Sequence, residues 1–276
     1  MGVLGAGHIC LSCSDIDSQS SIFNQFGYST LFEDYSWPVA LDKFPYMRKN
    51  AELHSNVFLK SKSGISIEFI AHHDKLNSEH GPYQVLFGDS ENILPNTEKK
   101  EIGLVGEAIE GALKCRVKRC FVPQLNTSYY QPATKEKLAH GVEMVALVCN
   151  DLKASSSFWE EGLGFKKVVS SQDNSFRWKL LHFLSPIPAW NLKVLLVEDK
   201  KKETMRFYLD DSGWTCLSFL VKSTEVSTKY LQEKGGIDLG RRFELAVGGR
   251  SMRFCFVRGP DEELIELVEP RMKDSR

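Results

Sequence analysis

Three stretches of this chain repeat one local pattern, and the repeat restricts the fold more than any other feature of the sequence. Each stretch begins with a short run of apolar and β-branched residues, which is typical of a buried strand. Each run then ends at an Asp or Ser, a residue that often caps the start of a helix. The three runs begin at His8, Met144 and Cys216.

Each run is followed by apolar residues at helical spacing and then by glycine, which favours the end of a helix. The sequence therefore predicts helices over residues 18–26, 153–162 and 225–234. A further β-rich segment follows each helix at a similar distance, over residues 66–70, 193–198 and 264–269. The repeating unit is therefore a β-α-β-β-β module, and the first copy is longer because residues 37–56 form an insertion.

The chain between the first two visible copies is long enough for a fourth module, whose sequence motifs are degenerate. Ile102, Val105, Ile109 and Leu113 have helical spacing, and residues 119–125 suit a strand. We therefore expect two domains, residues 1–139 with a degenerate second module and residues 140–276 with two clear ones.

Three segments carry a resemblance to a known family: "HICLSCSDI", "EMVALVCNDLKASSSFWEEGLGF" and "RGPDEELIELVE". They resemble the vicinal oxygen chelate superfamily, which includes glyoxalase I, extradiol dioxygenases and bleomycin-binding proteins, and the chain resembles its tandem-domain members. The resemblance implies an α+β fold in which tandem βαβββ modules form curved, open-barrel mixed sheets with helices outside. It also implies that a metal or a small ligand binds in the cup of each paired sheet.

The resemblance further implies that the metal ligands come from the first and the last strand of a module. Both positions must point into the cup, and the alternation of side chains along a strand allows this. The matching positions, module by module, are His8 and Glu68, Met144 and Leu195, and Cys216 and Glu266. Because Met144 and Cys216 stand where an extradiol dioxygenase needs histidine, that activity is not expected.

In single-chain relatives with four modules, the first module pairs with the last. That pairing would bring His8, Glu68 and Glu266 together as ligands of a divalent metal, with Zn, Ni, Mn and Fe all suited to the set. Glu68 and Glu266 would also be the catalytic carboxylates. The alternatives are that His8 is a core histidine bonded to a backbone carbonyl and that Glu68 is a surface-facing residue. Sequential pairing of the modules would place Glu68 and Glu266 in separate cups.

Two functions from different classes remain open. The first is a metal-dependent lyase, isomerase or oxygenase that acts on a small oxygenated molecule, and it rests on His8, Glu68 and Glu266. The alternative is a metal-free protein of the bleomycin-resistance type that binds or sequesters a small molecule. It rests on the lost ligand positions and on aromatic residues that could line a pocket. These aromatic residues are Trp37, Phe44, Tyr46, Trp178, Phe183, Trp190 and Trp214.

Charge and glycine placement exclude several other classes. Lys and Arg number 35 against 36 Asp and Glu, so the chain lacks the basic excess of a nucleic-acid-binding protein. No apolar run reaches the length of a membrane span. Gly5 and Gly7 precede a strand rather than a helix, so they do not form a phosphate loop and no nucleotide cofactor is expected.

The seven cysteines are scattered and odd in number, which indicates buried reduced thiols rather than disulfides. Cys10 and Cys13 have C-x-x-C spacing, but on a strand they would face opposite sides and could not chelate one zinc. The start of the chain has no basic leader followed by a long apolar segment. We therefore expect a cytoplasmic protein that acts as a monomer or homodimer.

Overall fold

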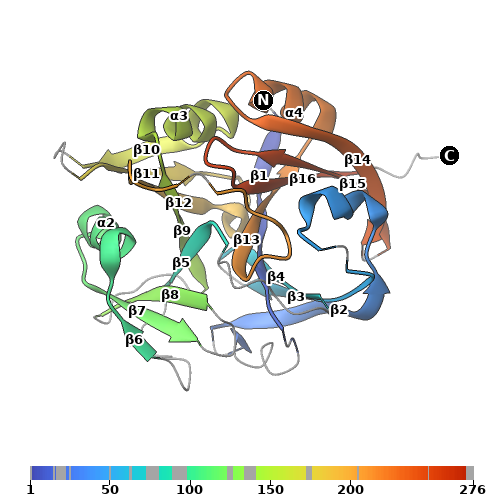
Figure 1. Ribbon diagram of the computed structural model, residues 1–276, viewed down its shortest axis with the longest axis horizontal. Helices are drawn as coiled ribbons and strands as arrows, with labels where there is room; N and C mark the ends of the chain where they lie inside the picture. Colours follow the sequence, from blue (N-terminus) through green and yellow to red (C-terminus); the bar gives the residue numbers. More distant parts are fainter. Residues whose placement is uncertain are drawn as a thin grey trace.

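The computed structural model describes most of the chain in thirteen stretches. These are residues 2–14, 16, 23–24, 26–49, 51–61, 64–72, 81–88, 98–122, 127–133, 141–171, 176–203, 205–247 and 249–271. Two eight-stranded mixed sheets make up most of the described chain (Figure 1). Among the described residues no helix is both long enough and apolar enough to cross a membrane.

The first sheet, here called the terminal sheet, takes its strands from both ends of the chain. In spatial order the strands are β14 (Ile237–Val247), β15 (Arg250–Arg258), β16 (Leu264–Pro270), β13 (Gly213–Val221), β1 (Val3–Ser12), β4 (Ser66–His72), β3 (Leu53–Ser61) and β2 (Tyr28–Pro38). The first and last modules are thus joined where β1 runs antiparallel to β13.

The second sheet, here called the central sheet, is formed by the middle of the chain. In spatial order the strands are β10 (Lys166–Ser170), β11 (Trp178–Phe183), β12 (Leu192–Glu198), β9 (Val142–Cys149), β5 (Tyr83–Phe87), β8 (Thr127–Pro132), β7 (Val117–Val122) and β6 (Glu98–Lys100). Here β5 runs antiparallel to β9 and joins the second and third modules. The predicted first-with-last pairing is confirmed, and the sequential alternative is wrong.

The mixed sheets and repeated modules confirm the predicted α+β fold class. The proposed boundary between residues 139 and 140 falls between β8 and β9, and each sheet takes strands from both sides of it. The division into domains 1–139 and 140–276 therefore remains a proposal. The strands are hydrogen-bonded into two sheets, and each sheet combines strands from both proposed domains.

Two of the predicted helices form where their caps indicate. The Asp151 carboxylate accepts hydrogen bonds from two backbone N–H groups at the start of α3 (Leu152–Ser157), which continues as the π-helical turn η3 (Phe158–Gly162). The Ser223 hydroxyl accepts from the N–H of Val226 at the start of α4 (Thr224–Gln232). The helix expected over residues 18–26 lies largely outside the described residues.

The degenerate second module contains the expected helix and strand. The helix α2 (Gly103–Leu113) follows β6, and β7 (Val117–Val122) begins two residues before the segment 119–125 that suited a strand and overlaps it. Val105, Ala108 and Ile109 of α2 pack with Met144 and Leu195 in one apolar cluster. This helix therefore covers the face of the central sheet that carries the two lost ligand positions.

Because side chains alternate along each strand, the two faces of a sheet carry different clusters. The largest cluster spans both sheets and includes Phe158, Trp159 and Leu231 from the helical segments beside them. The terminal cup is defined here as the face of the terminal sheet that carries His8, and the central cup as the face of the central sheet that carries Met144. The central cup is lined by an apolar cluster that contains Met144 and Leu195.

Candidate metal centre

Four neighbouring strands bring the candidate ligands together. His8 and Cys10 are two residues apart on β1 and therefore share a face. Glu68 stands opposite Cys10 in the parallel pairing of β1 with β4. Glu266 stands on β16, which is parallel to β13, and β13 is the strand that pairs with β1. The alternation of side chains and the first-with-last pairing are thus sufficient to place all of these side chains in the terminal cup.

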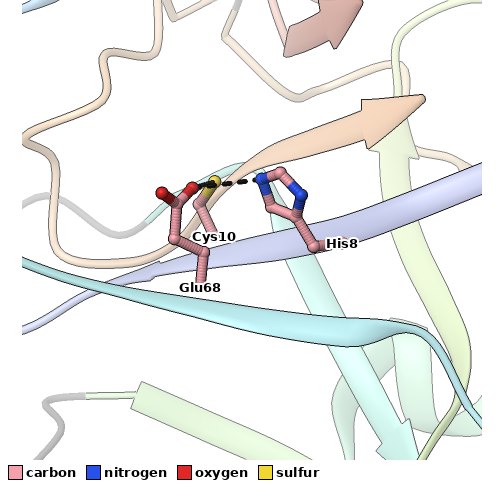
Figure 2. A group of neighbouring side chains, drawn as sticks. All are labelled: His8, Cys10 and Glu68. Atoms are coloured by element: carbon pink, nitrogen blue, oxygen red, sulfur yellow. Dashed lines mark hydrogen bonds and ion pairs between the residues drawn. The ribbon is translucent and has the colours of Figure 1, made fainter. Parts of the chain in front are cut away.

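The side chains of His8, Glu68 and Glu266 converge. The His8 Nε2 atom lies 3.0 Å from Oε2 of Glu68 and 3.4 Å from Oε2 of Glu266. Figure 2 shows the His8 ring and the Glu68 carboxylate reaching toward each other from β1 and β4, with the Cys10 thiol beside them. The side chains of the three residues are only 11%, 12% and 6% exposed, so the group is largely shielded from water.

These separations fit donors that share one ion. Two atoms that are each about 2.1 Å from an ion lie about 3.0–3.4 Å apart at octahedral or tetrahedral angles. Moreover, His8 Nε2 and Glu266 Oε2 are buried, and among the described residues they meet in an ion-pair contact rather than in a well-directed hydrogen bond. A cation between these donors would satisfy them and would offset the repulsion between the two carboxylates. The donor set therefore fits a divalent metal.

The charges of the group are strongly coupled. Burial lowers the pKa of His8, but its acidic neighbours Cys10, Glu266 and Glu68 outweigh burial and raise that pKa well above its ordinary value. Burial raises the pKa of Glu68, but His8 and then Lys43 outweigh it and hold that pKa well below its ordinary value. Without a metal the group is therefore an imidazolium held by carboxylates.

Cys10 is the member of the group that sequence reasoning treated only as a buried thiol. Its Sγ atom donates a hydrogen bond of 3.1 Å to Oε2 of Glu68, and it belongs with His8 and Glu68 to a set of donors able to hold an ion. The signal that could have identified it is the i, i+2 spacing from His8 on a strand, which places both on one face. All seven cysteines are buried thiols outside any disulfide, as expected.

The second oxygen of Glu68 is fixed by a neighbouring strand. Asn56 of β3 donates from Nδ2 to Oε1 of Glu68 at 2.5 Å. This contact leaves Oε2 as the oxygen that faces His8. Hydrogen bonds of this kind orient metal ligands in many proteins.

Aromatic side chains cover one side of the terminal cup. Tyr46, at the end of η1 (Leu41–Tyr46), packs against Phe256 of β15 with ring centroids 4.5 Å apart. Both belong to the apolar cluster that contains Cys10 and Cys216. Of the aromatic residues singled out in the sequence, Phe44 and Tyr46 thus line this cup, whereas Trp178 packs in the central one.

The central cup has no equivalent donor set among its described residues. The strand registers make Gln84 and Tyr130 the second module's counterparts of His8 and Glu68. The Tyr130 hydroxyl donates to Oε1 of Gln84 at 2.9 Å. With Met144 and Leu195 at the other two positions, this cup holds an apolar cluster and α2 where the terminal cup holds charges.

Neither a protein-family model nor a curated protein sequence matches the chain. Solved structures do match it. Glyoxalase I from Zea mays aligns with a TM-score of 0.61 and 14% identity over 97% of this chain and 92% of the maize protein. Its V278E variant gives a TM-score of 0.62 at the same identity, with the same 97% and 92% coverage.

A provisionally assigned dioxygenase from Bacillus subtilis aligns with a TM-score of 0.58 and 10% identity over 98% of this chain and 86% of that protein. At these identities the similarity concerns the fold. The pairing of the modules, their strand order and these alignments agree with one another. The chain has the tandem-module fold of the vicinal oxygen chelate superfamily, as the resemblance of its sequence motifs implied.

Proposed function

We propose that this protein is a metal-dependent enzyme of the lyase or isomerase type that acts on a small oxygenated molecule in the terminal cup. The observation that carries the proposal is the convergence of the largely buried donor atoms of His8, Glu68 and Glu266. In this proposal the three residues hold one divalent cation. The cation would supply Lewis-acid polarisation of a substrate oxygen.

The carboxylates of the site would perform the proton transfer. The side chains of Glu68 and Glu266 are largely buried, and each places a carboxylate oxygen beside the imidazole of His8. A carboxylate within reach of a polarised substrate can take a proton from the neighbouring carbon and return it to another atom. Asn56 would keep Glu68 in the orientation that this transfer requires.

The surroundings favour a small substrate with an apolar part. Tyr46 and Phe256 form an aromatic wall beside the charged group. Lys43 of η1 lies close enough to Glu68 to lower the pKa of that carboxyl. We expect the positively charged side chain of Lys43 to attract an oxygen-rich substrate. Lys43 is not needed to hold the metal.

A metal-free binding protein is the second candidate, and one observation favours it. The raised pKa of His8 means that an imidazolium can balance the carboxylates without any ion. A cup of this kind would bind a polar molecule through hydrogen bonds to the charged group. Metal content therefore separates the two candidates.

The proposed reaction is tested by proton exchange at carbon. The protein, stripped with chelator and then reconstituted with each of Zn, Ni, Mn and Fe(II), is incubated in D₂O with a panel of small α-hydroxycarbonyl compounds. We expect deuterium to enter next to the carbonyl with reconstituted protein, and we expect Glu68→Gln and Glu266→Gln to abolish it. His182→Ala, in the central sheet, is the matched control. Exchange that does not depend on metal or on the two carboxylates would contradict the proposal.

A further inference from the structure

A cavity of about 490 Å³ opens in the central sheet, apart from the metal centre. Its volume lies within the range of small-molecule sites in proteins. The residues that bear on its chemistry are Gln84, Lys100, Glu101, Arg119, Phe121 and Trp214. The proposed function uses none of them.

The cavity adjoins the part of the central cup that α2 fills. Gln84 lines the cavity, and its carbonyl oxygen accepts a hydrogen bond from Tyr130, which packs in the apolar cluster of α2. In Figure 1 the strands β6, β7 and β8 lie below α2. These three strands carry five of the described residues that line the cavity, Lys100, Arg119, Phe121, Thr127 and Ser128.

Two cations face this cavity from neighbouring strands. Lys100 of β6 stands directly opposite Arg119 of β7 in their antiparallel register, and both line the cavity. Like charges directly opposite each other are destabilising in a sheet. Among the described residues that line the cavity, Glu101 is the single acidic one, so these residues carry an excess of one positive charge.

Arg119 has an unused donor. Its Nε atom is buried and has no hydrogen-bond partner among the described residues. A guanidinium in this state is suited to a planar anion, because its N–H groups form a rigid fork that matches a carboxylate. Trp214 Nε1 is a second buried donor without a partner in the part of the chain that the structure describes.

The remaining wall combines the hydroxyl side chains of Thr127 and Ser128 with aromatic rings. The Lys100 Nζ atom lies 5.3 Å from the ring centroid of Phe121, and Trp214 adds a second ring to the lining. Aromatic side chains contribute contact area to an apolar ligand at low entropy cost. The site thus combines a cationic end with an aromatic body.

We propose that this cavity binds a small organic anion, a carboxylate carried on an aromatic or apolar body, with Arg119 and Lys100 holding the carboxylate. The excess of one positive charge favours a monoanion over a dianionic phosphate ester. The described residues that line the cavity include none of the candidate metal ligands His8, Glu68 and Glu266, so the proposed site does not use the metal. Binding should therefore survive removal of metal.

The test is calorimetric titration of the full chain with 1-naphthoate, with its uncharged analogue 1-naphthamide, and with the dianion 1-naphthyl phosphate. The variants are Arg119→Gln and Lys100→Gln, and Arg116→Gln is the control because Arg116 is exposed and does not line the cavity. Wild-type protein is measured with and without chelator. Thermal unfolding establishes that each variant is folded.

We expect naphthoate to bind with and without chelator, and Arg119→Gln to weaken it by about tenfold or more, as loss of a charged hydrogen bond predicts. Lys100→Gln, at an exposed position, should weaken it by about threefold or more, whereas Arg116→Gln should stay within about twofold of wild type. Naphthamide should bind at least about tenfold more weakly than naphthoate. The proposal would be overturned if wild-type protein did not bind naphthoate or if it bound naphthamide as tightly as naphthoate. It would also be overturned if the folded variants Arg119→Gln and Lys100→Gln both bound naphthoate as tightly as wild type. Tighter binding of the naphthyl phosphate would overturn the assignment to a monoanion.

Discussion

Cys10 of β1 lies directly opposite Cys216 of β13 in the antiparallel pairing that joins the two ends of the chain. This register determines the candidate site. His8 lies two residues before Cys10, and the strands β4 and β16 flank the pair on either side. The carboxylates of Glu68 and Glu266 therefore reach one imidazole, although each comes from a different module.

The contact between Asn56 and Glu68 predicts an effect on metal affinity. Replacing Asn56 with Ala removes the donor to Oε1 and lets the Glu68 carboxylate rotate. Because such outer contacts often contribute tenfold to hundredfold to metal affinity, we expect Zn²⁺ to bind about tenfold more weakly or worse. Competitive titration with a zinc chelator measures this. An unchanged affinity would show that the hydrogen bond does not orient the ligand.

Cys10 is expected to stay outside the coordination sphere, because its S–H already donates to Glu68 and hard carboxylates dominate the set. Protein loaded with Co²⁺ should therefore lack the near-ultraviolet thiolate-to-cobalt absorption band. Its spectrum should be the same in the Cys10→Ser variant. A strong band that disappears on this substitution would instead make Cys10 a ligand.

Burial of Glu263 predicts a pH-dependent stability. Burial, together with the charge of Asp261, raises the pKa of Glu263 to about 8. Between about pH 4.5 and pH 8 the folded state thus keeps a proton that the unfolded state releases. The free energy of unfolding therefore falls as the pH rises through this window and is level above it.

The Glu263→Gln variant should lose this dependence. Its neutral amide can still accept the hydrogen bond from the N–H of Asp261. We expect the variant to be more stable than wild type at pH 8 by roughly 1–3 kcal/mol, and the difference to shrink near pH 5. Urea unfolding at the two pH values measures this, with the exposed Glu244→Gln as control. A parallel shift at both pH values would refute the titration of Glu263.

The packing of α2 predicts a structural role for that helix. Ile109 is fully buried against Met144 and Leu195 in the central cup. Ile109→Ala should lower the free energy of unfolding by about 2–4 kcal/mol, because it leaves a cavity in the cluster. Metal uptake at the terminal cup should not change. A loss below about 1 kcal/mol would mean that α2 packs loosely.

Much of the fold could be predicted because the repeat leaves local signals. The caps Asp151 and Ser223, and the alternation around His8, are properties of neighbouring residues. The ligand positions followed from the resemblance of whole motifs rather than from spacing alone. First-with-last pairing was the decisive assumption, and the antiparallel contact of β1 with β13 confirms it.

The remainder depended on long-range contacts. No local sequence motif identifies the positions of Gln84 and Tyr130. Their equivalence to His8 and Glu68 follows only from the strand register. The same is true of α2. Its apolar face could be predicted from the sequence, but the sheet against which it packs could not. Lys100 and Arg119 became neighbours only when β6 paired with β7.

The most direct test of the central claim is metal content. Purified protein is stripped, reconstituted with each of Zn, Ni, Mn and Fe(II), dialysed and analysed by plasma mass spectrometry, alongside His8→Ala, Glu68→Gln and Glu266→Gln. We predict about one ion per chain for wild type and for the controls His182→Ala and Glu244→Gln, and almost none for the three ligand variants, with circular dichroism unchanged. Wild-type protein that retains no ion, or ligand variants that retain as much as wild type, would contradict a metal centre at His8, Glu68 and Glu266.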